Sequence, residues 1–196
     1  MPKSNNFPKN PANVLLLPGW QNSGPEHWQS RWERAYGYQR VDQHDWMRPL
    51  RGDWIARLED VLLECDEPAL LVGHSLGCQL VAAWASHSGQ THRVRGALLV
   101  APPDVERAEL RPVLPSWSPI PWQCLPFQSV VLASRDDPYG SFERAHQMAL
   151  AWGAEFVDYG HRGHINAESG LGDWDEGHEL IEKIKRKPWS QKNSKA

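Results

Sequence analysis

The chain has 196 residues, and its 21 lysines and arginines against 24 aspartates and glutamates give a formal net charge of −3. This length favours one domain with one sizeable core. The near-balanced charge argues against the basic field that binds nucleic acid or an anionic membrane surface, so we expect no nucleic-acid partner and no membrane partner.

Three cysteines, Cys65, Cys78 and Cys124, are odd in number and form no CxxC pair. This pattern argues against a disulfide framework and against a zinc site, so no metal is predicted. No run approaches the roughly 18 apolar residues of a membrane-spanning helix, and the N-terminal residues lack the apolar centre of a signal peptide. The sequence therefore predicts a soluble, cytoplasmic protein.

Short apolar runs alternate along the chain with longer amphipathic segments. The runs occupy residues 13–19, 38–46, 68–75, 95–103, 128–137 and 154–160, and the helical patterns occupy residues 26–36, 53–65, 76–86, 141–153 and 175–186. Four runs are almost continuously apolar, as strands covered on both faces are. Such alternation indicates βαβ units. We predict an α/β fold with a mostly parallel sheet of about six strands and helices on both faces.

The two ends of the chain are polar. Residues 1–12 and 187–196 contain few apolar side chains, and we predict that they are flexible ends of a single domain spanning residues 13–186.

Residues 104–127 break the alternation, because their five prolines exclude one regular helix. The segment leaves the carboxyl end of a predicted strand, where a cap over a site would lie. We predict that its aromatic residues Trp117, Trp122 and Phe127 form the wall of a small apolar acyl pocket. Packing of these rings in the core is the alternative.

Residues 73–77 read Gly-His-Ser-Leu-Gly and lie between a predicted strand and a predicted helix. In this context a G-x-S-x-G pattern is typical of a nucleophile elbow, because the glycines leave room for the strained turn that exposes the serine. Ser75 is therefore predicted to be a nucleophile, with a simple helix cap as the alternative. His74 adjoins the nucleophile on the turn and is interpreted as a structural residue or as one that supports the catalytic residues from behind.

A serine nucleophile requires a base, and the base requires an orienting acid. In open doubly wound hydrolases these residues follow in the order serine, acid, histidine. Asp136 and Asp137 end one predicted strand run, and His161 and His164 follow the last run. Both groups lie at strand carboxyl ends, where open α/β sheets collect their sites. An Asp-Pro turn and a polar loop histidine are the alternative interpretations.

Four stretches carry a family resemblance: LLLPGWQNSGPEHWQSRWE, LVGHSLG, SRDDPY and GHINAESGLGDW. Together they resemble the small serine hydrolases of α/β-hydrolase fold that include the retinoblastoma-binding hydrolase of animals and short bacterial relatives. The similarity covers about residues 13–186. It implies a cytoplasmic hydrolase of small carboxylic esters with a Ser-Asp-His triad and no cofactor.

The resemblance implies the triad Ser75, Asp137 and His164. Asp137 is chosen because the family's acid stands immediately before a proline, and His164 because it lies in the GHIN match. The oxyanion is expected to bind two backbone N–H groups, from Leu76 after the nucleophile and from Trp20 in the loop after the first strand.

Two alternatives stay open. A thioesterase or a peptidase uses the same triad. Residues 63–67, Leu-Glu-Cys-Asp-Glu, also match the Leu-x-Cys-x-Glu pattern that docks on retinoblastoma-type pocket proteins, although a groove-binding peptide must be extended and exposed.

Overall fold

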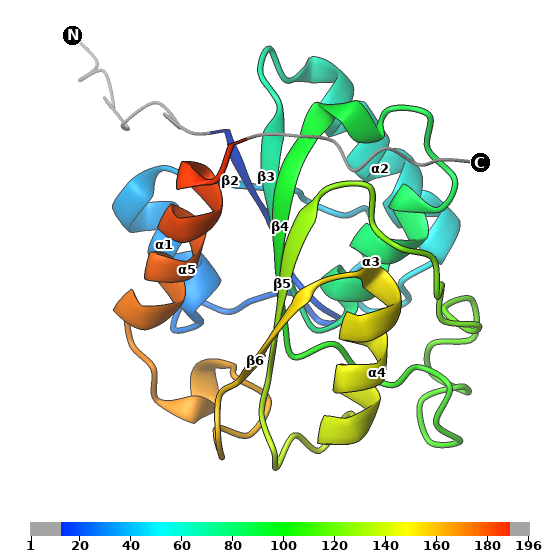
Figure 1. The fold of residues 1–196 in the computed structure, drawn as a ribbon. Helices are drawn as coiled ribbons and strands as arrows, with labels where there is room; N and C mark the ends of the chain where they lie inside the picture. The colour runs from blue at the N-terminus through cyan, green and yellow to red at the C-terminus, as the bar shows by residue number, and fades with distance from the viewer. Residues whose placement is uncertain (1–12, 189–196) are drawn as a thin grey trace, which may run out of the picture.

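Six parallel strands form the centre of the computed structural model, which describes residues 13–188 (Figure 1). The strands are β1 (Val14–Leu17), β2 (Gln39–Arg40), β3 (Ala69–His74), β4 (Val94–Val100), β5 (Gln128–Ala133) and β6 (Glu155–Asp158). They lie in the order β2-β1-β3-β4-β5-β6, and every neighbouring pair is parallel. This arrangement confirms the predicted α/β fold.

Helices cover both faces of the sheet. They are α1 (Trp28–Tyr36), α2 (Arg51–Glu64), α3 (Leu76–Ala85), α4 (Phe142–Trp152) and α5 (Asp175–Arg186), with short 3₁₀ helices at Thr91–Arg93 and Ala167–Ser169. Helices α1 and α5 lie on one face, and α2, α3 and α4 lie on the other (Figure 1). Among the described residues, no helix is long and apolar enough to cross a membrane.

Alternating strand residues supply two separate cores. In β1, Leu15 and Leu17 pack into the core beneath α2, α3 and α4, whereas Val14 and Leu16 pack into the core beneath α1 and α5. All four side chains are at most 1% exposed. Because both faces of the strand are buried, its sequence is continuously apolar.

Residues 38–46 form a much shorter strand than the apolar run predicts. Only Gln39 and Arg40 pair with β1, at the edge of the sheet. The Asp45 carboxylate accepts hydrogen bonds from the N–H groups of Met47 and Arg48, which bends the chain into a turn. The rest of the predicted run therefore leaves the sheet and enters a turn.

Residues 104–127 contain turns and no regular helix or strand. The Arg144 side chain of α4 forms an ion pair with Glu106 and lies 4.6 Å from the centroid of the Trp122 ring. At the other side, the Trp117 indole N–H donates to the Pro49 carbonyl at 2.9 Å. The segment is thus fixed to the body of the molecule by side chains at several points.

Candidate active site

Ser75 lies between β3 and α3, at the carboxyl edge of the sheet. Its φ of 54° and ψ of −122° place it in a region that side-chain-bearing residues rarely adopt. Such a conformation costs on the order of 1–3 kcal/mol and must be held by its surroundings. Hydrogen bonds from the Ser75 N–H to the Val100 carbonyl and from the Cys78 N–H to the Ser75 carbonyl, both 2.9 Å, fix the turn.

The two glycines of the motif are required by close backbone contacts. A Cβ atom on Gly77 would lie 2.0 Å from the Leu17 carbonyl oxygen, and one on Gly73 would lie 2.9 Å from the Gly77 carbonyl group. Contacts this short exclude a side chain at either position. The sequence pattern around Ser75 is therefore a geometric requirement of this turn, as predicted for a nucleophile elbow.

His164 and Asp137 meet on the loops after β6 and β5. The Nδ1 atom of His164 lies 2.9 Å from both carboxylate oxygens of Asp137, and the two side chains are 8% and 6% exposed. Because a carboxylate only accepts, Nδ1 carries the hydrogen. The Tyr139 N–H also donates to Asp137 at 2.9 Å. The imidazole is thus oriented, and its Nε2 atom is left as the position that can accept a proton.

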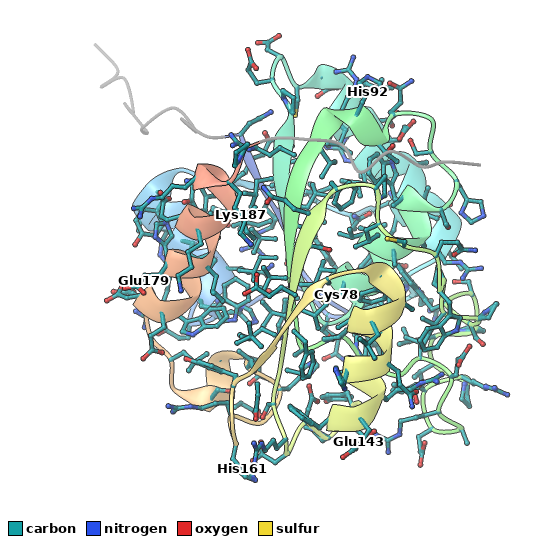
Figure 2. All side chains as sticks on the ribbon, viewed as in Figure 1. Cys78, His92, Glu143, His161, Glu179 and Lys187 are labelled. Carbon is teal, nitrogen blue, oxygen red and sulfur yellow. The ribbon has the colours of Figure 1, made fainter. Side chains whose placement is uncertain are left out.

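The competing residues of the sequence have different surroundings. Asp136 accepts hydrogen bonds from the Ser134 hydroxyl at 2.6 Å and from the Gly163 N–H at 2.9 Å. These two bonds, led by the Ser134 hydroxyl, lower the pKa of Asp136. His161 is exposed, and Figure 2 shows its side chain at the outer end of the loop after β6. Asp136 therefore supports the loop that carries His164.

Ser75 and His164 both line one cavity of about 300 Å³. The cavity has apolar walls from Trp20, Leu110 and Leu114. Leu114 is 2% exposed and Leu110 is 9% exposed, so both are held in place by packing. A serine and an oriented imidazole that share a small, partly apolar cavity can attack a bound carbonyl compound.

The two residues expected to supply the oxyanion donors lie directly after Ser75 and in the loop after β1. Leu76 is the first residue of α3, so its N–H has no partner within the helix. The loop after β1 touches the elbow, because a Cβ atom on Gly19 would lie 2.7 Å from the Ser75 Cβ. The Trp20 N–H, next in this loop, donates no backbone hydrogen bond within residues 13–188. Its ring lines the cavity, and the indole N–H donates to Met47 at 3.1 Å.

The three aromatic residues predicted to wall the pocket lie elsewhere. None of them is among the residues that line the cavity. Trp117 and Phe127 are each 1% exposed within the core beneath α2, α3 and α4, and Trp122 lies at the surface beside Arg144. The burial of a large ring and the hydrogen bond of the Trp117 indole favour the core over the cavity. Leu110 and Leu114 of the same segment line the cavity instead.

Leu110 and Leu114 were not predicted, because only the aromatic rings of residues 104–127 indicated a pocket. Their i, i+4 spacing was the available signal, and the Leu114 N–H does donate to the Leu110 carbonyl at 2.8 Å. Tyr139, Asn166 and Glu168 also line the cavity. They flank the triad residues in sequence, so only the fold reveals their place.

A second hollow of about 440 Å³ adjoins the first. The two share four residues, His164, Tyr139, Asn166 and Glu168. His164 therefore stands between two spaces, one of which also contains Ser75.

One cysteine, Cys78, lies on α3 directly after the nucleophile turn. Cys78 is fully buried, and burial raises the pKa of its thiol well above the ordinary value, which keeps it protonated and unreactive (Figure 2). The described residues contain no group of three or more potential metal ligands.

In the stretch 63–67, Leu63 and Glu64 form the end of α2, so an extended docking conformation would require this turn to unwind.

Residues 14–183 match a family of proteins described as serine hydrolase. A solved structure described as a YdeN-like hydrolase, from Pectobacterium atrosepticum, is 33% identical to this chain, with a TM-score of 0.78. That match covers 88% of this chain and 90% of the other. No curated protein gives a significant match in sequence.

Two more distant structures share the fold. The ydeN gene product of B. subtilis is 21% identical with a TM-score of 0.75, over 90% of this chain and all of that one (100%). An esterase from Exiguobacterium antarcticum, EaEST, is 13% identical with a TM-score of 0.67, over 89% and 92% of the two chains. These likenesses agree with the α/β-hydrolase fold that the sequence motifs predict.

Proposed function

The chain belongs to the serine hydrolase family, and we propose that it cleaves small carboxylic esters through an acyl-enzyme formed on Ser75. One observation carries the proposal. The His164 Nδ1 is held by both oxygens of Asp137, while His164 shares a cavity with a serine on a strained strand-to-helix turn. A histidine that is oriented by a carboxylate and shares a cavity with the serine supports a role as the base of a triad.

The first step transfers the acyl group to the enzyme. His164 Nε2 takes the proton of the Ser75 hydroxyl as its oxygen attacks the ester carbonyl carbon, and Asp137 stabilises the imidazolium that forms. The carbonyl oxygen becomes an oxyanion that accepts hydrogen bonds from the Leu76 and Trp20 N–H groups. The carbon–oxygen bond to the alcohol then breaks, and the imidazolium returns the proton to the leaving oxygen.

The second step hydrolyses the acyl-enzyme. A water molecule gives a proton to His164 and attacks the acyl carbon, which releases the acid and restores the Ser75 hydroxyl. The adjoining hollow shares His164 with the Ser75 cavity and offers space for the alcohol part of the ester. The volume of the Ser75 cavity, about 300 Å³, supports short acyl chains, from acetyl to about hexanoyl.

The test uses a fluorophosphonate probe, which reacts with an activated serine. We expect the probe to label the wild-type chain and to fail with Ser75→Ala. Ser86→Ala is the matched control, since Ser86 follows the same helix and its hydroxyl donates to the Ala83 carbonyl at 2.8 Å. It should label as the wild type does. Labelling of Ser75→Ala at the wild-type rate would disprove the assignment of the nucleophile.

The same preparations are then assayed on p-nitrophenyl esters and on matched acyl thioesters. A higher kcat/KM on the esters supports an esterase, because the proposed triad serves both reactions and only the substrate separates them. Faster turnover of the thioesters would replace the ester assignment with a thioesterase.

A further inference from the structure

The loop that carries His164 is bonded at successive backbone atoms. The Arg162 N–H donates to the Ser134 hydroxyl at 2.8 Å, and the Gly163 N–H donates to Asp136. The Ile165 N–H donates back to the Arg162 carbonyl at 3.1 Å. The backbone on the amino-terminal side of His164 is therefore fixed by groups within and beside the loop.

Ile165, directly after His164, has a φ of 48°. A β-branched residue at positive φ is a genuine outlier, because its Cβ substituents crowd the backbone in this region. The Ile165 side chain is completely buried. A conformation of this kind persists only where the surroundings hold it, and such sites cluster near functional groups.

Two buried side chains hold the strained backbone through its carbonyl groups. His74 Nε2 lies 2.9 Å from the His164 carbonyl oxygen, and the Trp28 indole N–H donates to the Ile165 carbonyl at 2.8 Å. His74 is 5% exposed and Trp28 is 1% exposed. Two successive carbonyls, on either side of the strained Ile165, thus each receive one buried hydrogen bond. We call these donors the His74–Trp28 pair.

The chemistry of His74 suits a fixed donor. A carbonyl oxygen only accepts, so the hydrogen must be on the Nε2 atom of His74. Burial, followed by the nearby His27 and His164, lowers the pKa of His74 well below its ordinary value. The ring is therefore neutral at physiological pH and keeps a single donor directed at the loop.

We propose that the His74–Trp28 pair positions His164 for proton transfer, by fixing the peptide groups from which its side chain projects. The proposal rests on the proposed role of His164 as the base. His74 immediately precedes Ser75, so one side chain at the elbow ties the base to the nucleophile. Trp28 adds a second fixed point from α1. Asp137 orients the ring, and the pair sets the position of its backbone.

The test compares substitutions that remove the N–H donor of His74 or Trp28 with substitutions that keep a donor or change a neighbouring residue. His74→Leu removes the Nε2 donor, and His74→Gln keeps an N–H at a similar reach. Trp28→Phe removes the indole donor but keeps a ring. Trp32→Phe is its control, because Trp32 lies on the same helix and its indole N–H donates at 2.6 Å to the Asp173 carbonyl, nine residues after His164.

We expect His74→Leu and Trp28→Phe to lower kcat by roughly 10- to 100-fold, since a displacement of about 1 Å can cost 100-fold, with KM changed less than about twofold. His74→Gln should recover most of kcat, and Trp32→Phe should keep it. Thermal melts ensure that each variant is compared while folded. A loss of kcat that follows only the melting temperature, in Trp32→Phe as much as in Trp28→Phe, would overturn the proposal.

A second readout needs no substrate. The proton between His164 Nδ1 and Asp137 should give a far-downfield NMR signal in the wild-type chain. We expect it to shift or broaden in His74→Leu and to return in His74→Gln. An unchanged signal and unchanged kcat in folded His74→Leu would refute the role of the pair. Failure of the hydrolase proposal would show differently, as wild-type protein that neither labels at Ser75 nor turns over esters.

Discussion

At the scale of single residues, two adjacent carboxylates have different tasks. Asp137 binds the imidazole of His164, while Asp136 binds the Ser134 hydroxyl and the backbone of the histidine loop. Both are fixed by hydrogen bonds, so both contribute to the geometry of the site. Only Asp137 contacts a side chain that would exchange a proton during catalysis.

We predict that Asp137→Asn lowers kcat by about 10⁴-fold, because an amide in this place favours the wrong imidazole tautomer. Steady-state kinetics on a short p-nitrophenyl ester measure the effect. Losses in Asp137→Asn and Asp136→Asn that are equal and mild would show that the orienting acid is another residue.

Asp136→Asn is the matched control, and we expect it to keep most of kcat because the amide oxygen can still accept the Gly163 N–H. Its effect should be on stability. The pKa of Asp136 is lowered from 3.8 in the folded chain. Its contribution is therefore present above this value and is lost as pH falls through the folded pKa. The difference in Tm between wild type and Asp136→Asn should shrink as the pH approaches the folded pKa of Asp136.

The sequence predicts local backbone geometry well where a motif fixes it. The Leu17 carbonyl leaves no space for a side chain at Gly77, so the motif around Ser75 can be recognised in the sequence. His74 shows the limit of this reasoning. Its contact with the His164 carbonyl joins residues 90 positions apart, and nothing in the local sequence indicates that pairing.

At the scale of elements, residues 104–127 illustrate which properties a sequence pattern determines. The prolines correctly predict an irregular segment, because they exclude a regular helix. The choice between core and cavity depends on neighbours such as Pro49 and Arg144, which lie far away in the chain. This is why Trp117 lies in the core and Trp122 lies at the surface.

We predict that Leu114→Ala moves the preferred acyl chain of the ester substrates to a longer length. The removed side chain enlarges the cavity, and each further CH₂ that becomes buried can add about 0.8 kcal/mol, or roughly fourfold in kcat/KM. A series of p-nitrophenyl esters of increasing acyl length measures this shift.

Leu125→Ala is the control for Leu114→Ala. Leu125 belongs to the same segment and is 1% exposed, but it does not line the cavity. Both substitutions should lower stability by about 2–5 kcal/mol, as large-to-small core changes do. An unchanged chain-length profile in Leu114→Ala, or the same shift in Leu125→Ala, would remove Leu114 from the acyl pocket.

At the scale of the whole molecule, the site is assembled from distant parts of one sheet. Ser75 follows β3, Asp137 follows β5 and His164 follows β6. This part of the arrangement is predictable from sequence, because the carboxyl ends of parallel strands meet at one edge. Contacts from both faces hold the surroundings of the site: Trp28 of α1 binds the loop after β6, and Arg144 of α4 pairs with Glu106 in residues 104–127.

Because of this assembly, we predict that the site and the two cores are lost together when the chain unfolds. Tryptophan fluorescence reports both cores. Trp32 is fully buried in the core between the sheet and helices α1 and α5, and Trp84 is fully buried in the core on the opposite face of the sheet. Fluorophosphonate labelling of Ser75 reports the site. In a urea titration the two signals should share one midpoint, as expected for cooperative unfolding of a small domain. If mobile loops hold the site, labelling should be lost at a lower urea concentration than the fluorescence signal. That result would show that the buried hydrogen bonds around His164 do not couple the site to the two cores.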